Sequence, residues 1–146
     1  MVIILNINDI NDSNKEIVSE FLKTIDSISE IDYSILSNGV AIVNDHNQIC
    51  GYITYEKFSE YGLIRYFIFQ KNLEFEYIKN LYLELIKKAI DDEIECFITI
   101  GNSIDVVSLF KQLNFYEIDF SNFVVNDHQL YGTEFENTII LKNDFL

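Results

Sequence analysis

The middle of the chain changes from a strand-like to a helix-like pattern of apolar residues. Residues 63–69 are mostly bulky, β-branched or aromatic, which is typical of a buried strand. A polar break follows at residues 70–72, after which Ile78, Leu81 and Leu85 recur at helical spacing. This pattern predicts a strand, a loop and a crossover helix. The first amides of such a helix attract anions, because they have no partner within the helix.

The N-terminal part predicts a strand followed by two helices. Residues 1–7 are rich in Val and Ile, as strands are. Ser13 or Asn14 can cap a helix that continues to about residue 25. A second, shorter helix is expected over residues 26–36, where apolar residues again recur at helical spacing.

Further strands are predicted on either side of the central unit. Residues 40–43 and 48–55 flank the turn Asn44-Asp45-His46-Asn47 and indicate a hairpin, because Asn and Asp tolerate the backbone of tight turns. Residues 95–100 follow the crossover helix, so that strand should run parallel to the strand at 63–69. The remaining elements are a short helix opened by Ser103 and strands near 116–125 and 133–141.

These elements predict a single α/β domain over residues 1–146. The expected architecture is a twisted mixed sheet of six or seven strands with helices on both faces. The strands at 63–69 and 95–100 are expected to splay apart. A chain of 146 residues buries about two-thirds of its unfolded surface without help from disulfides or metals.

The composition predicts a globular protein of the cytoplasm. Hydrophobic residues make up 49% and charged residues 23% of the chain, and no apolar run approaches the ~20 residues of a membrane span. The apolar start at residues 1–5 is too short for a signal peptide and lacks its basic flank. Cys50 and Cys96 lie in strand-like runs, so we expect reduced core residues.

The net charge of −14 narrows the range of partners. It comes from 24 acids and ten bases, and Arg65 is the single arginine. Such a chain does not suit nucleic acid or an anionic membrane, since both require a basic patch. A cationic amine or a basic peptide is the expected partner, although the charge also serves solubility alone.

Two further expectations concern metals and association. His46 and His128 lie in predicted turns without the spacing of a metal site, so no metal is expected. Aromatic residues make up 14% of the chain, which leads us to expect that a second copy covers a sheet edge or face in a homodimer.

Two segments resemble the GCN5-related N-acetyltransferase (GNAT) family. Ile3-Ile4 with Asn11-Asp12 and Ile17 is similar to the family's opening strand and acidic turn, and residues 106–115, VVSLFKQLNF, are similar to its late A-x-x-L-Y-x-K-x-G-F segment. The predicted order of elements resembles the GNAT fold over nearly the whole chain. The resemblance implies an acyl-CoA-dependent N-acyltransferase that acts on an amine.

The resemblance also implies acetyl-CoA as the cofactor. In the family, the pantetheine arm pairs with the central strand and the pyrophosphate lies on an R/Q-x-x-G-x-G/A loop, where glycines let backbone amides approach phosphate. That loop corresponds to residues 74–79 here. The implied cofactor contacts are Phe67, Ile68, Phe69, Phe75, Glu76, Tyr77, Ile78, Lys79, Ser103 and Phe110.

The loop departs from the family pattern at each diagnostic position. Glu74 replaces the basic or amide residue, Tyr77 and Lys79 replace the two small residues, and Glu76 adds a second carboxylate. Two carboxylates repel a pyrophosphate by roughly 2.8 kcal/mol each at ~6 Å and an effective dielectric of 20, more than a helix N-terminus returns. The expectation is that this loop excludes CoA. Repulsion exceeds attraction unless Lys71 or Lys79 turns inward, and even then the Tyr77 side chain occupies space that the family leaves empty.

The expected acid and base are also displaced from the family pattern. The family's thiolate-protonating tyrosine corresponds to Phe110, so Tyr116 or Tyr131 would have to supply the proton. The nearest candidates for a general base are Glu56 and Glu60, because residues 63–69 contain no carboxylate. Each of these residues also fits a purely structural role, as an exposed acid or a packed tyrosine.

Two functions therefore stay open from the sequence. The first is an acyltransferase that moves an acyl group from CoA to an amine. The second is a catalytically inactive GNAT-fold domain that binds a partner and does not bind CoA. Saturable binding of acetyl-CoA separates the two.

Overall fold

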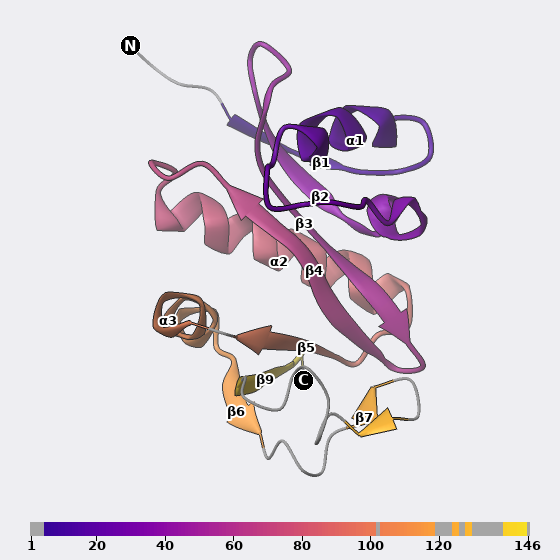
Figure 1. The fold of residues 1–146 in the computed structure, drawn as a ribbon, viewed down its shortest axis with the longest axis vertical. Helices are drawn as coiled ribbons and strands as arrows, with labels where there is room; N and C mark the ends of the chain where they lie inside the picture. Colours follow the sequence, from indigo (N-terminus) through magenta and orange to yellow (C-terminus); the bar gives the residue numbers. More distant parts are fainter. Residues whose placement is uncertain (1–4, 102, 119–123, 126–127, 130–138, 146) are drawn as a thin grey trace. The chain divides into compact units, whose positions relative to one another are not determined.

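The computed structural model describes residues 5–101, 103–118, 124–125, 128–129 and 139–145, which form a mixed sheet with helices (Figure 1). The strands are β1 (Leu5–Asp9), β2 (Val40–Asn44), β3 (Ile49–Phe58), β4 (Tyr61–Phe69), β5 (Cys96–Gly101), β6 (Tyr116–Ile118), β7 (Val124–Val125), β8 (His128–Gln129) and β9 (Ile139–Asp144). The helices are α1 (Lys15–Lys23), the 3₁₀ helix η1 (Tyr33–Asn38), α2 (Phe75–Asp91) and α3 (Ile104–Gln112).

Seven of these strands form one sheet in the order β1-β2-β3-β4-β5-β9-β6, and β7 pairs with β8 in a separate ribbon. The β4–β5 pair is parallel, whereas β1–β2, β2–β3, β5–β9 and β6–β9 are antiparallel. The predicted mixed sheet of six or seven strands is therefore confirmed, with seven strands. Parallel pairing joins Tyr61–Leu63 to Cys96–Ile98. The splay predicted for the rest of these two strands stays a prediction.

The chain divides into two compact units, which we describe separately. The N-terminal unit comprises Met1–Glu56 and Arg65–Ala89, and the C-terminal unit comprises Lys57–Ile64 and Ile90–Leu146. The boundary crosses β4. The expectation of one domain over residues 1–146 stays a prediction.

In the N-terminal unit, α1 and α2 cover opposite faces of the sheet. Ala41 faces Tyr52 across the β2–β3 ladder and Ile42 faces Gly51, so these two pairs point to opposite sides. Tyr52 packs in a cluster with Val18 and Leu22 of α1. A Cβ at Gly51 would lie 3.6 Å from side-chain atoms of Leu73 and of Leu81 in α2. Helices on both faces are confirmed for this unit.

The helix predicted over residues 26–36 is wrong in extent and in type. The structure has only the 3₁₀ helix η1, which begins at Tyr33 after Asp32 accepts a hydrogen bond from the Ser34 amide. Side chains of β3 bind its carbonyls: the Tyr52 hydroxyl donates to Leu36 O at 2.8 Å and the Thr54 hydroxyl to Ile35 O at 2.7 Å. Tertiary hydrogen bonds therefore replace the intrahelical ones on which the periodicity argument relied.

In the C-terminal unit, β9 lies between β5 and β6. Six register pairs join β5 to β9, and three join β6 to β9. The strand predicted near 133–141 extends further, to Asp144, and the strand predicted near 116–125 includes the separate segments β6 and β7. Residues 119–123, 126–127 and 130–138 lie outside the described residues. The predicted turn around His128 is therefore only partly described, and His128 itself lies in β8, opposite Val125.

Cys50 is buried and Cys96 half-buried, and both are free thiols. Burial raises the pKa of each thiol. Among the helices of the described residues, none is both long and apolar enough to cross a membrane.

Candidate functional site

The C-terminal half of β4 carries three of the residues implied to contact a cofactor. Phe67, Ile68 and Phe69 are all half-buried. The rings of Phe67 and Phe69 meet edge to face with centroids 5.4 Å apart. Ile68 points the other way and packs with the α1 cluster. The strand therefore presents an aromatic pair on the face opposite Ile68.

Tyr66, in the same strand, has a backbone φ of 38°, which sequence reasoning did not predict. A positive φ is unusual for a bulky residue and interrupts a regular strand, because it re-aims the neighbouring backbone groups. The phenol is fixed at its far end: its oxygen accepts from the Asp32 amide at 2.9 Å, and it donates to Glu30 O at 3.3 Å. The Arg65 guanidinium lies 5.7 Å from the ring centroid.

The loop implied to bind pyrophosphate leads directly into α2. The Glu74 carbonyl accepts from the amides of Tyr77 and Ile78, at 3.0 and 3.4 Å, so the amides of Phe75 and Glu76 precede the first hydrogen bonds of the helix. Ile78 is buried and belongs to the core, which separates it from the other implied contacts. Glu74, Phe75, Glu76 and Lys79 are exposed and Tyr77 is half-buried.

Two lysines beside this loop differ from every other cation of the protein. All ten Lys and Arg residues are within the described part of the chain, and eight of them form ion pairs. Two lysines have no ion-pair partner among the described residues. They are Lys71, in the connection between β4 and α2, and Lys79, in the first turns of α2. Both are exposed. The segment at the start of α2 therefore holds the two lysines whose charge no described residue pairs.

Tyr77, at the first glycine position of the family loop, lines a cavity in the N-terminal unit. The cavity has a volume of about 430 Å³. Its other lining residues are Leu5, Asn44, Cys50, Gln70, Asn72, Leu73 and Glu74. The ring of Tyr77 thus contributes to a wall of this cavity, together with the loop and the ends of β1 and β2.

The two candidate bases have different surroundings. Glu56 is half-buried near the C-terminal end of β3, where that strand leaves the N-terminal unit. It accepts a hydrogen bond from Arg65 Nη1 at 2.5 Å. Glu60 is exposed in the turn between β3 and β4, within the C-terminal unit, where its backbone oxygen accepts from the Glu95 amide at 2.7 Å. Glu56 is thus held beside the half of β4 that carries Tyr66, and Glu60 precedes the other half.

Ser103 and Phe110 both belong to α3 but have different environments. Ser103 caps the helix, because its Oγ accepts from the Val106 amide at 3.2 Å. Phe110 is buried, with its ring 5.0 Å from that of Phe115 in an edge-to-face contact. The predicted opening of this helix by Ser103 is confirmed, and Phe110 is a core residue of the C-terminal unit.

Tyr116, the candidate acid, donates its hydroxyl proton to Asp144 Oδ2 at 2.5 Å. This hydrogen bond raises the pKa of Tyr116 and lowers the pKa of Asp144, because it stabilises the protonated phenol and the ionised carboxylate. Tyr116 lies opposite Lys142, whereas Gly101, which precedes the start of α3, lies opposite Ile139. Ile139 and Lys142 are three residues apart on β9, a distance of about 10 Å along the strand, so Tyr116 is not adjacent to Ser103. Tyr131 lies outside the described residues.

Metal ligands do not gather in the described part of the chain. No group of three or more His, Cys, Asp or Glu side chains there is placed to hold a metal ion. His46 is exposed in the β2–β3 turn, where its Nε2 lies 3.7 Å from Asp45 Oδ1.

The order of strands, the crossover helix α2 and the insertion of β9 between β5 and β6 are those of the GNAT fold, and comparison with solved structures agrees. No protein-family profile matches the chain, and no curated protein matches it by sequence. The fold is nevertheless shared with solved GNAT acetyltransferases at TM-scores up to 0.72. The chain therefore has the fold of GCN5-related N-acetyltransferases, as the sequence resemblance implied.

Three structures illustrate the likeness. Neisseria gonorrhoeae N-acetylglutamate synthase, in complex with coenzyme A and N-acetylglutamate, is 13% identical and matches 100% of this chain at a TM-score of 0.72. This chain spans 36% of that enzyme. A GNAT-family acetyltransferase from Staphylococcus aureus is 17% identical over 98% of this chain and 100% of its own, at 0.70. A Mycobacterium tuberculosis protein in complex with CoA is 12% identical over 97% of this chain and 99% of its own, at 0.68.

Proposed function

We propose that this protein is an acyl-CoA-dependent N-acyltransferase that acts on a cationic amine. The observation that carries the proposal is the pair Lys71 and Lys79, the two cations of the described chain without an ion-pair partner, at the start of α2. In an acidic protein, lysines left unpaired at a helix N-terminus provide what a pyrophosphate requires. The GNAT fold of solved CoA complexes supports the same assignment.

The charges of the loop decide whether a pyrophosphate is attracted or repelled. Glu74 and Glu76 each cost roughly 2.8 kcal/mol at ~6 Å and an effective dielectric of 20, and a lysine in contact at ~3 Å returns about twice that. Both glutamates are exposed and turn into solvent at little cost, whereas Lys71 and Lys79 have long side chains that reach a bound anion. Attraction therefore exceeds repulsion in this proposal.

The chain's own residues then have distinct roles. An acyl-CoA supplies its acyl group as an activated thioester. The amides of Phe75 and Glu76, together with Lys71 and Lys79, hold its phosphates. Glu56 is the better candidate to take a proton from the amine, because Arg65 fixes it beside the Tyr66 half of β4. Tyr116 retains its proton at neutral pH, as an acid requires, but its hydroxyl is bonded to Asp144.

The test is calorimetric titration of the full chain with acetyl-CoA, beside the double variant Lys71→Ala/Lys79→Ala. We expect saturable binding by the parent and at least about tenfold weaker binding by the double variant, since each lysine forms a charge-assisted hydrogen bond. Lys87→Ala is the matched control, because Lys87 is an exposed lysine of α2 already paired with Glu84 at 3.0 Å. Parent and double variant binding equally well would contradict the assigned role of the lysines.

Transfer itself is measured by release of the CoA thiol in the presence of amines. We expect release with cationic amines and slower release with neutral ones of the same size, because the net charge of −14 attracts cations. CoA binding without release on any amine tested would leave the enzyme proposal refuted and the binding site intact.

The second candidate is a domain that binds no CoA, and the carboxylates favour it. Glu74 and Glu76 occupy the loop, and Phe110 is a buried core residue without a proton to donate. This alternative predicts that calorimetric titration detects no binding of millimolar acetyl-CoA to the parent, and that the variant Glu74→Gln/Glu76→Gln binds it. Circular dichroism confirms that the variant retains its helices.

A further inference from the structure

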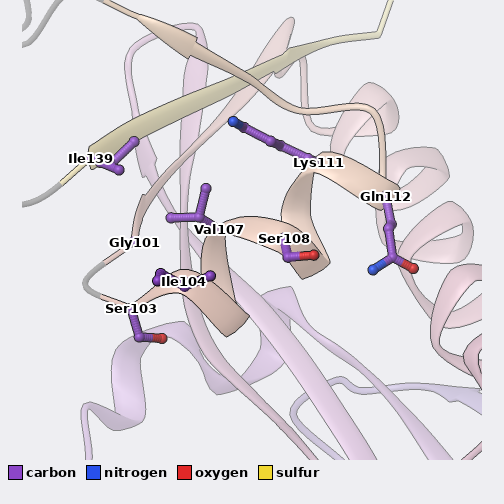
Figure 2. Close-up of a pocket in the computed structure, with 8 residues that line it drawn as sticks. All are labelled: Gly101, Ser103, Ile104, Val107, Ser108, Lys111, Gln112 and Ile139. Carbon is purple, nitrogen blue, oxygen red and sulfur yellow. The ribbon is translucent and has the colours of Figure 1, made fainter.

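The C-terminal unit contains an open cavity on one side of α3, and of its lining residues only Ser103 is implied by the resemblance to contact a cofactor. Its volume is about 610 Å³, within the range of small-molecule sites. Figure 2 shows its lining: Gly101, Ser103, Ile104, Val107, Ser108, Lys111, Gln112 and Ile139. The α3 residues among them recur three or four apart, so they share a face of the helix. Phe110, implied to contact a cofactor, lies instead in the core against Phe115.

The cavity has an aliphatic wall that no described residue covers. Ile104 is 87% exposed and Ile139 40% exposed, and Val107 is buried at the base. Val107 reaches this position because Gly101 has no side chain: a Cβ there would lie 2.7 Å from Val107 Cγ2. In Figure 2, Val107 and Ile139 point toward one another. An isoleucine this exposed beside a cavity marks a surface that gains from an apolar ligand.

The polar part of the lining consists of one cation, Lys111, and neutral side chains that can donate hydrogen bonds. Lys111 extends over the cavity toward Ile139 (Figure 2). Ser103 Oγ already accepts from the Val106 amide, so its proton is free to be donated. Ser108 and Gln112 add a hydroxyl and an amide. No acidic side chain lines the described cavity, although the C-terminal unit has twelve Asp and Glu against three Lys.

The single positive charge of the cavity lining, Lys111, has a partner that a ligand can replace. Lys111 Nζ lies 2.9 Å from Glu117 Oε1, and both side chains are about half exposed, at 52% and 50%. Exposed ion pairs of this kind contribute little to the stability of the fold. A ligand carboxylate can therefore replace Glu117 as the partner of Lys111 with little loss of folding free energy. The hydrocarbon part of the ligand then leaves water and packs on the aliphatic wall.

We propose that this cavity binds a small carboxylic acid with an aliphatic body. The one cation of the lining, Lys111, attracts a carboxylate and repels an ammonium, the neutral hydroxyls and amide can donate to the carboxylate, and Ile104, Val107 and Ile139 take the hydrocarbon. The residues of this cavity and those of the loop assigned to phosphate belong to different units and none is shared, so the proposal does not rest on CoA binding.

The experiment is titration of the full chain, without CoA, with octanoate, octylamine and octanol as probes of equal chain length. We expect octanoate to bind most tightly and octylamine most weakly. Lys111→Met should weaken octanoate about tenfold, as loss of a charge-assisted hydrogen bond does, and leave octanol unchanged. Glu117→Gln should tighten octanoate, because it removes the internal competitor.

Two further variants keep the proposal falsifiable. Ile104→Glu changes an exposed position, so the fold is retained while a carboxylate repels the probe, and octanoate binding should be lost. Lys87→Met, an exposed lysine of α2, should bind as the parent does. Octylamine binding as tightly as octanoate, or octanoate binding that is absent in the parent or unaffected by Lys111→Met, overturns the assignment.

Discussion

Lys88 makes three polar contacts with its ammonium in the N-terminal unit. Its Nζ donates to Ile10 O at 2.6 Å and Gly39 O at 2.9 Å and lies 2.6 Å from Asp9 Oδ1. The side chain is only 22% exposed. One ammonium from α2 therefore satisfies two carbonyls and one carboxylate next to β1 and β2.

We expect Lys88→Met to lower the free energy of unfolding by about 1–3 kcal/mol, because Ile10 O and the Asp9 carboxylate lose this donor while Gly39 O retains only the Ile10 amide. Methionine retains the length of the stem, so packing changes little. Urea denaturation followed by circular dichroism measures the difference. The adjacent Lys87→Met is the control: its side chain is 72% exposed, and its loss should cost no more than about 0.5 kcal/mol. Equal effects of the two variants would mean that the buried contacts contribute nothing.

The sequence predicted those features of the candidate site that depend on the spacing of neighbouring residues, but not those that depend on residues distant in the sequence. Glu74, Tyr77 and Lys79 were placed by flanking hydrophobic residues, and α2 begins where they predicted. Whether a lysine is free depends on distant partners: Lys88 meets Asp9, 79 positions away in the sequence. That Lys71 stays unpaired could not be derived from spacing.

At the scale of elements, the segment before β2 shows why a helical pattern failed. Residues 26–38 contain Asp, Ser and Asn at seven positions, and such side chains compete for backbone groups. Here Asp32 caps the Ser34 amide, and its own amide donates to the Tyr66 hydroxyl on β4. The segment is fixed by β3 and β4 instead of by its own hydrogen bonds.

Tyr66→Phe tests this attachment. The Asp32 amide loses its acceptor, so we expect its hydrogen exchange to accelerate at least about tenfold, while overall stability falls by about 1–2 kcal/mol, because the hydroxyl makes two hydrogen bonds. Exchange is followed by NMR at neutral pH. Tyr33→Phe, at a neighbouring tyrosine that is 51% exposed, should leave the Asp32 amide unchanged. An unchanged rate in Tyr66→Phe would show that the phenol does not hold the segment.

The other elements were predictable because their patterns are strong. β2, β3, α2 and β5 begin within two residues of the expected positions, and α3 starts after its serine cap. The positive φ of Tyr66 was not predictable, since tertiary contacts hold a conformation that tyrosine rarely adopts. The β5-β9-β6 order became evident only from the register.

At the scale of the whole molecule, charge is distributed unevenly. The C-terminal unit has twelve acids and three lysines, and each lysine is in an ion pair, with Asp92, Glu117 or Asp144. Within this unit the acids therefore outnumber the lysines four to one. The homodimer and the cytoplasmic location stay predictions, and light scattering at high protein concentration tests the first.

Excess negative charge should make the protein more stable in salt. At net charge −14, self-repulsion opposes the compact state, and raising NaCl from 20 to about 500 mM shortens the Debye length from about 20 Å to below 5 Å. The same salt weakens the ion pairs, but most are exposed and contribute at most about 1 kcal/mol each. We therefore expect the free energy of unfolding in urea at pH 7 to rise by at least about 0.5 kcal/mol, the value of one surface pair. Near the isoelectric point, about pH 4.3, the repulsion is absent and the rise should vanish. A fall with salt at pH 7 would mean that the ion pairs, and not the net charge, dominate the electrostatics of this protein.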